Sequence, residues 1–444
     1  MSNLQKLYIC PMKKKSFIIF FLLLFSCENE LKINDNWRDV PVVYAVLNSG
    51  TQEDADGSGF GPTVPESDFN YDGDNQSDIN YTHFVRVQKS FLGSEAAYAY
   101  TGIHDSIYYD ASDLEVWLEL VDNQNGDVGS AFYLDLVDSF ELDSLFIFKE
   151  DGLFDSSNHY LYRIPSVASD LIPFDDLRKN YKISVFNTLT GDTAFAETNI
   201  VEPVKMTRPL PNGSASILRF GVNVPLSIEI KPSKNAKMYS ISLIFNYIEQ
   251  HKDDYLYDVL QGNPLPFTNL NYKSVEWTLS DELATEQQLL GLTNTTIKKI
   301  IYGPQFFEFL KTQITEQDLS DPDFYRYPLY THYQGTNNGI TAGIYHRCVD
   351  LDITAVNTEL YTYLNANAPN VGLNQERPEY NNIVNGIGHL SSRSILTMNN
   401  LRIDQSTMDS LSFGQVTKNL NFACYSTLGT QGLTIKFGFD CEEN

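Results

Sequence analysis

The sequence predicts a mainly β protein, with an N-terminal immunoglobulin-like β-sandwich followed by a mixed α+β domain that has an antiparallel sheet. Three observations support this fold class. Short runs of alternating apolar and polar residues, separated by turn residues, fill the chain from Val42 to about Glu202. Prolines at 203, 209 and 211 then interrupt any continuing strand. Strand-like and helix-like runs are mixed after them, so we place the sandwich at 41–205 and the α+β domain at 206–444.

The clearest strand of the first domain is 114–120. Its leucines and Val116 fall on one face, while two glutamates and Trp117 fall on the other. Similar runs predict further strands at 42–47, 82–89, 132–137, 144–148, 159–164 and 181–186. About seven to nine strands of this length are typical of an immunoglobulin-like domain.

The second domain combines a long strand with short helices. The run 238–248 alternates strongly, which predicts that the apolar residues at its odd positions are buried and that Ser240, Ser242 and Asn246 lie opposite. A helix is predicted at 281–290, because acidic residues favour its start and Gly291 its end. The other predicted elements are helices at 305–314 and 358–364 and a strand at 344–355.

The first 26 residues are typical of a bacterial lipoprotein leader. Three lysines at 13–15 precede an apolar run, 17–25, that is too short to span a bilayer, and Ser26 then precedes Cys27. We therefore expect that 1–26 is removed, that Cys27 carries a diacylglycerol lipid, and that 27–40 forms a tether. The alternative is an uncleaved membrane anchor. The start codon, Met1 or Met12, stays open.

Two acidic residues shortly after the expected lipidation site predict where in the cell the protein is exported. Glu28 and Glu30 resemble the acidic export tag that carries lipoproteins of the Bacteroidota to the outer face of the outer membrane. The net charge of the chain is −26, and removal of the four leader lysines lowers it to −30. Such a charge repels phosphate backbones and anionic headgroups, so we expect no nucleic-acid partner.

The cysteines allow one disulfide in the mature chain. Beside Cys10 in the leader and the lipidated Cys27, the chain holds Cys348, Cys424 and Cys441. We favour a bond between Cys424 and Cys441, because it would join a C-terminal hairpin. The two pairings of Cys348 stay open.

An acidic insertion at 49–80 contains half of a calcium-binding motif. Oxygen-bearing side chains occur at alternate positions, with glycine sixth, in Asp68, Asn70, Asp72 and Asp74. The twelfth position lacks the bidentate acid, since Asp78 comes one residue early. The two interpretations are a weak Ca²⁺ site and a flexible acidic loop.

Four potential metal ligands alternate along the strand predicted at 344–355. His346, Cys348, Asp350 and Asp352 share one face of it. Same-face neighbours on a strand lie about 7 Å apart, so four in a row cannot reach one ion. We therefore expect a solvated strand face, with at most two of these residues joining a metal site completed from elsewhere.

A candidate contact loop lies at 321–330. Its rings, Phe324, Tyr325, Tyr327 and Tyr330, interleave with prolines and charges and do not alternate as a strand does. Most other aromatic residues sit at predicted buried positions. We therefore expect these four rings to contact a partner.

Nothing in the sequence indicates an enzyme. It contains no nucleophile elbow, no His-Glu-x-x-His and no phosphate loop, and the glycines at 386 and 388 are spaced for turns. Adjacent acids at 175–176 and 253–254 are typical of exposed loops more than of a glycosidase pair. We expect a non-enzymatic protein that requires no cofactor.

Several segments resemble a family of Bacteroidota surface lipoproteins found alongside TonB-dependent outer-membrane receptors. These segments are ELKINDN at 30–36, VPVVYAVLN at 40–48, FVRVQKSFLG at 84–93, RPEYNNIVNGIG at 377–388, SSR at 391–393 and DSLSFG at 409–414. The resemblance covers most of the mature chain and implies a surface lipoprotein with an immunoglobulin-like front domain and no catalytic residues. The insertion 49–80 and the tail after Phe422 depart from it.

The expected function is binding without catalysis. By analogy with that family, we expect an accessory subunit of an outer-membrane transport or assembly complex, whose partner is an outer-membrane β-barrel protein. The alternative is a freestanding adhesin or glycan-binding lipoprotein. The sequence leaves open the partner, the transported substrate and the oligomeric state.

Overall fold

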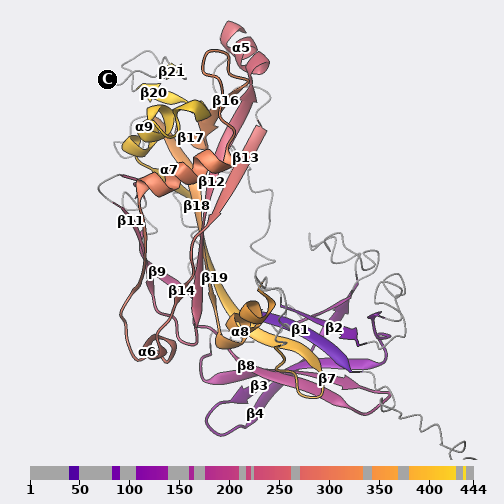
Figure 1. Cartoon of the computed structure of the whole chain (residues 1–444). Coiled ribbons are helices and arrows are strands. Elements are labelled where there is room, and N and C mark those ends of the chain that lie inside the picture. The colour runs from indigo at the N-terminus through magenta and orange to yellow at the C-terminus, as the bar shows by residue number, and fades with distance from the viewer. Residues whose placement is uncertain are drawn as a thin grey trace, which may run out of the picture. The chain divides into compact units, whose positions relative to one another are not determined.

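Figure 1 shows the computed structural model of the chain. Residues 1–39, which hold the predicted leader and nearly all of the tether, lie outside the described residues. The described residues are 40–49, 83–90, 107–138, 160–164, 176–209, 217–221, 225–261, 271–333, 343–368, 380–426 and 434–436.

The described part of the chain is mainly β, as predicted. The strands are β1 (Pro41–Asn48), β2 (Phe84–Lys89), β3 (Leu114–Asp122), β4 (Val128–Tyr133), β5 (Asp135–Val137), β6 (Leu161–Arg163), β7 (Lys179–Asn187), β8 (Thr193–Asn199), β9 (Lys205–Arg208), β10 (Ile217–Leu218), β11 (Leu226–Lys231), β12 (Met238–His251), β13 (Asn271–Thr278), β14 (Glu282–Leu283), β15 (Ile297–Ile301), β16 (Phe324–Pro328), β17 (Tyr330–Tyr333), β18 (Gly343–Val356), β19 (Ile387–Ile403), β20 (Cys424–Ser426) and β21 (Thr434–Lys436). The helices are α5 (Lys252–Gln261), α6 (Glu286–Leu289), α7 (Gly303–Gln313), α8 (Thr358–Asn367), α9 (Gln405–Phe413) and the 3-10 helix η6 (Lys418–Leu420).

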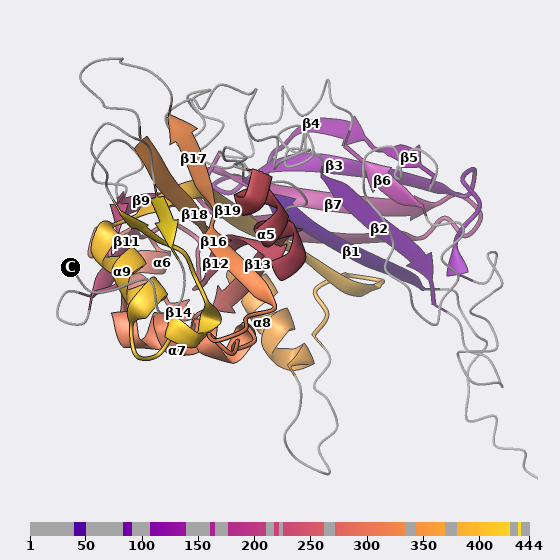
Figure 2. The ribbon, with the colours of Figure 1, turned by 90° about the horizontal axis from the view of Figure 1, so that it is seen from above.

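Two sheets enclose the first hydrophobic core. One is the four-stranded sheet β4-β3-β7-β8, and the other is the β19-β1-β2-β6-β5 part of a larger sheet. Figure 2 shows β4, β3 and β7 side by side in one of these sheets and β1 beside β2 in the other. Val43, Val85 and Tyr162 from the large sheet join Leu118 and Ile183 from the small one in this core. Burying a side chain of this size contributes roughly 1.5–3 kcal/mol.

The alternation in β3 is confirmed. Leu114, Val116 and Leu118 are buried, whereas Glu115 is exposed and Trp117 is partly exposed. The prediction of a single strand at 132–137 is wrong, because the chain leaves the strand at Leu134. The residues before it belong to β4, which pairs with β3, and those after it form β5, which pairs with β6 in the other sheet. The run 144–148 lies outside the described residues, and the immunoglobulin-like assignment stays a prediction.

Strand β19 joins the two predicted domains. It pairs in parallel with β1 through Tyr44 and His389, and antiparallel with β18 through Ala355 and Ser394 (Figure 1). Ile200 belongs to the first hydrophobic core, whereas Val201 belongs to a second one. This change of core lies close to the domain boundary predicted at 205. The two predicted domains are nevertheless not separate chain segments. A strand from 387–403 completes the first one, and 40–444 forms one compact unit.

Gly388 sits where β19 passes closest to β1. Its φ is +117°, and a Cβ atom there would lie 2.0 Å from the carbonyl oxygen of Val43. The glycine spacing predicted a turn at this residue, and that prediction is wrong, because Gly388 lies inside β19 and only Gly386 lies in a bend. Only glycine fits the backbone conformation and the space at Gly388.

Replacing Gly388 with alanine is therefore expected to lower the free energy of unfolding by about 2 kcal/mol or more, from backbone strain and the clash with Val43. Urea unfolding of the variant measures this cost. Gly126→Ala is the matched control, because Gly126 also has a positive φ but a Cβ atom there would meet nothing within 4 Å. Equal costs for the two variants would show that the close approach to β1 is unimportant.

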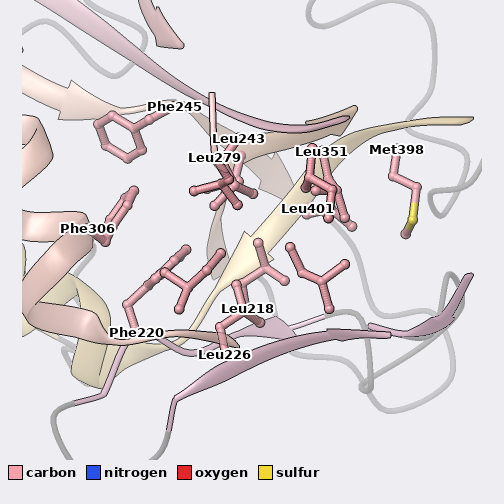
Figure 3. Close-up of a cluster of buried hydrophobic side chains, with 14 of the residues drawn as sticks. Leu218, Phe220, Leu226, Leu243, Phe245, Leu279, Phe306, Leu351, Met398 and Leu401 are labelled. Carbon is pink, nitrogen blue, oxygen red and sulfur yellow. The ribbon is translucent and has the colours of Figure 1, made fainter. Parts of the chain in front are cut away.

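The second hydrophobic core lies where β12, β18 and β19 meet α7 and β11. In β12 the predicted buried face is confirmed, except that Asn246 is buried as well. The rings of Phe220 and Phe306 stack with centroids 3.9 Å apart, and Phe245 meets Phe306 edge-on at 5.9 Å. Figure 3 shows these three rings at one end of the cluster, and Leu351, Leu401 and Met398 at the other.

The helix predicted at 281–290 is only partly confirmed. Residues 282–283 form β14, and α6 covers no more than 286–289. Its N-cap is Thr285, which forms a capping box with Gln288. Gly291 follows with φ +70° and ends the helical turn as predicted.

The other predicted helices are confirmed as α7 and α8, with ends that differ by a few residues. Helices α5 and α9 were not predicted. The acids at 253–254, assigned to a loop, lie in the first turn of α5, where the helix dipole favours them. Among the described segments, no helix is both long enough and apolar enough to cross a membrane.

Candidate functional site

Most of the residues predicted to carry function lie outside the described part of the chain. These are the lipidated Cys27, the export residues Glu28 and Glu30, and the calcium ligands Asp68, Asn70, Asp72, Asp74 and Asp78. Their roles stay predictions.

The predicted contact loop is a strand with a buried face. Residues 324–328 form β16, which pairs with β12. Tyr327 is 1% exposed, and its hydroxyl lies 3.2 Å from Oε1 of Gln250. Tyr325 is partly buried and stacks on Tyr255 with ring centroids 3.9 Å apart. The contact-loop prediction is therefore wrong for Tyr327, whose ring belongs to the core.

Arg326 explains why this strand departs from simple alternation. Its guanidinium is buried, and Nε lies 2.9 Å from Oε2 of Glu249 on β12. Nη1 donates to the carbonyl oxygens of Thr315 and Leu420, each at 2.8 Å. The backbone of Arg326 also bonds with that of Asn421 and Ala423. Arg326 thus fastens the C-terminal segment 420–423 to the sheet.

Tyr330 and Phe324 complete the set of predicted contact residues. Phe324 is partly buried at the first position of β16. Tyr330 opens β17, and its side chain lies outside the described part of the structure. Phe324 and Tyr325 are both partly buried in β16 and do not form an exposed aromatic loop.

The face of β18 is only partly solvated. Asp350 accepts a 2.6 Å hydrogen bond from Nδ2 of Asn246, and burial, with the nearby charge of Glu276, raises the pKa of Asp352. Cys348 is fully buried in the second core, which contradicts the solvated-face prediction at that position. Regular alternation fails there because the pairing of β18 with β19 shifts register next to Cys348. Within the described residues, no three potential ligands gather to hold a metal ion.

The described part of the chain contains one free cysteine and one disulfide-bonded cysteine. Cys348 is free, and burial raises the pKa of its thiol, so it is not a reactive thiolate. Cys424 is disulfide-bonded. It opens β20, which forms a hairpin with β21. Cys441 lies outside the described residues, so the bond from Cys424 to Cys441 stays a prediction.

The outer face of the sheet β4-β3-β7-β8 carries a line of aromatic side chains. The strand register places Tyr133, Trp117, Ser184 and Phe195 opposite one another across the four strands. Residues directly opposite each other share a face of a sheet. Tyr133 is 65% exposed, and its ring centroid lies 6.0 Å from that of Trp117. We call Tyr133, Trp117 and Phe195 the aromatic row.

A polar network holds the aromatic row in place. Oε2 of Glu119 lies 2.8 Å from Nζ of Lys182 and accepts a 3.1 Å hydrogen bond from Ser184. Burial raises the pKa of Glu119, but the hydrogen bonds from Lys182, Ser184 and Trp117 outweigh it, so the pKa lies below its usual value. Nζ of Lys182 also lies 5.1 Å from the centre of the Phe195 ring. Lys182 thus links the Phe195 ring to the carboxylate of Glu119.

The exposed charges described on this face are negative. Lys182 is paired with Glu119, whereas Glu115 and Glu197 are exposed on the same face. Glu197 lies opposite Lys182 in the next strand, and Glu115 lies opposite the partly buried Phe186. The row is therefore an aromatic strip with carboxylates at its borders.

Two histidines of the larger sheet are buried, one on β19 and one, His83, directly before β2. His389 on β19 is 4% exposed, stacks on Tyr363 of α8 with centroids 3.9 Å apart, and meets Tyr44 edge-on. Neither of its ring nitrogens has a hydrogen-bond partner among the described residues. Burial lowers the pKa of His389 to about 4. Burial and the charge of Arg393 lower that of His83 to about 4 as well.

Of the aromatic row, only the outward placement of Trp117 could be predicted from the sequence. The alternation of β3 places Trp117 on the outward face with the two glutamates, and that placement is confirmed. The neighbours of Trp117 come from residues 133, 184 and 195, which only the strand register brings together. For the histidines, no local pattern marks burial.

Comparison of the sequence with protein-family models gives no match, and comparison with curated proteins gives none either.

Proposed function

We propose that the protein is a lipid-anchored outer-membrane lipoprotein that faces the cell exterior. In this proposal it acts as a non-catalytic accessory or binding subunit of an outer-membrane transport or assembly complex. The observation that carries the proposal is the leader that ends in Ser26-Cys27, followed by Glu28 and Glu30.

The start of the compact unit supports this proposal. The unit begins at Val40, so about a dozen residues separate it from Cys27. An extended segment of that length reaches up to about 40 Å. A tether of this reach would let the folded body clear the lipid headgroups and meet a membrane protein beside it. The acidic body would stay off the anionic membrane surface.

Replacing Cys27 with serine is expected to move the protein from the membrane fraction to the soluble fraction, because the acyl chains that hold it are lost. Membrane fractionation followed by detergent phase partition measures this shift. A Cys27→Ser protein that stays with the membrane would contradict lipid anchoring at this residue.

The proposed partner is tested by isolating the complex. The tagged, lipidated protein is recovered from its native membrane in mild detergent, and the co-purifying proteins are identified by mass spectrometry. A stoichiometric β-barrel protein is the expected result. Recovery of the lipoprotein alone would contradict the accessory-subunit proposal. Protease treatment of intact cells tests the orientation, because resistance would indicate a periplasmic face.

A further inference from the structure

We propose that the aromatic row is a binding site for an extended chain of an uncharged polysaccharide. This inference deepens the proposed function by naming a ligand class, and it rests on that function only in requiring exposure to the cell exterior. The row consists of Tyr133, Trp117 and Phe195 on the outer face of the sheet β4-β3-β7-β8.

The geometry of the row suits a chain of sugar rings. Tyr133 and Trp117 lie on adjacent strands, with ring centroids 6.0 Å apart. Trp117 and Phe195 are separated by β7, and so by two strand spacings, or about 10 Å. Linked pyranose rings repeat on this scale, so a chain laid across the strands can place the apolar C–H faces of sugars on Tyr133 and Trp117, whose ring planes are inclined by 50°. The Lys182 ammonium lies over the ring of Phe195, which therefore borders the chain and does not stack on it. Aromatic side chains combine such an apolar face with low conformational freedom.

The charges on the face select against acidic ligands. The exposed carboxylates of Glu115 and Glu197 repel phosphate, sulfate and uronate groups but accept hydrogen bonds from sugar hydroxyls. Lys182, whose ammonium lies beside the row, is already paired with Glu119. The exposed charge therefore complements a ligand that is rich in hydroxyl donors and carries no negative charge.

Part of the row is held in place before any ligand binds. Glu119 accepts a hydrogen bond from Ser184 and pairs with Lys182, and Ser184 is buried although it lies on the outer face. Trp117 and Phe195 flank this serine, and both are partly buried. A preorganised surface loses less entropy on binding. Protein anchors, by contrast, typically fill a pocket at the centre of an interface, whereas this row is built on the face of a sheet.

The test uses the full, lipidated chain in mild detergent and isothermal titration calorimetry. The probes are the neutral hexaoses of cellulose, xylan, mannan and starch, together with hexagalacturonate as the acidic counterpart and a lysine-rich peptide. We expect at least one neutral hexaose to bind and hexagalacturonate not to bind. Failure of all four neutral hexaoses to bind would overturn the inference.

Variants separate stacking from structure. Tyr133→Ala should weaken binding of the neutral hexaose about 5- to 10-fold, because one stacking ring is lost. Tyr133→Phe should bind as the wild type does, since it keeps the ring. The matched control is Leu189→Ala, which removes an apolar side chain that is 74% exposed at the turn between β7 and β8. Unchanged binding in Tyr133→Ala would overturn the inference.

The outcomes also separate this inference from the proposed function. Binding of the lysine-rich peptide in place of every hexaose, abolished by Tyr133→Ala, would show a protein-binding face and overturn the inference. If no hexaose bound the wild-type chain and Tyr133→Ala no longer co-purified the β-barrel protein, the inference would be overturned too. The proposed function would still stand. Sugar binding by a protein that recovers no partner would support the inference and contradict the accessory-subunit proposal.

Discussion

Replacing Arg326 with alanine is expected to lower the free energy of unfolding by about 3–5 kcal/mol, the usual cost of removing one partner of a buried ion pair. Arg326 is 2% exposed and Glu249 is mostly buried, so the variant leaves an unpaired carboxylate in the core. It also leaves the carbonyl oxygens of Thr315 and Leu420 without a donor. Urea unfolding, or the loss in melting temperature, measures the effect.

The matched control for this prediction is Arg219→Ala. Arg219 pairs with Asp404 as Arg326 pairs with Glu249, but its side chain is 61% exposed. An exposed ion pair contributes about 0–1 kcal/mol, so this variant should change little. A double replacement, Arg326→Met with Glu249→Leu, should recover part of the loss, because no lone charge remains buried. A cost of Arg326→Ala as small as that of Arg219→Ala would show that the buried pair does not hold the C-terminal segment.

Arg326 also shows where local sequence patterns fail. The run from Phe324 to Pro328 looked like a loop because an arginine and prolines break its alternation. The run is a strand because β12 pairs with it along one edge, and residues 420–423 bond to Arg326 on the other. A buried arginine is stable only when its charge and its N–H groups are paired, and two of the partners of Arg326 lie 77 and 94 residues from it in sequence. No local pattern can supply these partners.

The patterns succeeded where one face of a strand meets a core. In β3 and β12 the period of two depends only on residues within the strand, so both buried faces could be predicted. The parallel pairing of β1 with β19 could not be predicted, because it joins residues such as Tyr44 and His389 from opposite ends of the chain. The same reason applies to the candidate site. Trp117 could be placed on an outward face, but its neighbours in the aromatic row follow from register alone.

Lowering the pH from 7 to 5 is expected to reduce the free energy of unfolding by about 4 kcal/mol through two histidines, His83 and His389. The pKa of each is lowered to about 4 in the folded chain, from an ordinary value of 6.5. Both are neutral in the folded state at pH 5, whereas the unfolded chain takes up a proton at each. The stabilisation is therefore complete above about pH 6.5 and is lost as the pH falls toward 4. Linkage gives about 2 kcal/mol for each histidine at pH 5.

Buried carboxylates act in the opposite direction over part of this range. Burial raises the pKa of Asp352 and of Glu359, so the folded chain binds their protons before the unfolded chain does. Acidification therefore adds stability at these two residues and masks part of the histidine effect. The contribution of one histidine has to be isolated by a variant and cannot be read from the wild type alone.

His389→Phe isolates it, because phenylalanine keeps a ring between Tyr44 and Tyr363 and removes the two unpartnered nitrogens. The fall in unfolding free energy between pH 7 and pH 5 should shrink by about 2 kcal/mol, with no loss of stability at pH 7. Urea unfolding at several pH values measures both quantities. If His389→Phe keeps the full wild-type pH dependence, His389 is not the buried neutral base that its stacked, unpartnered ring indicates.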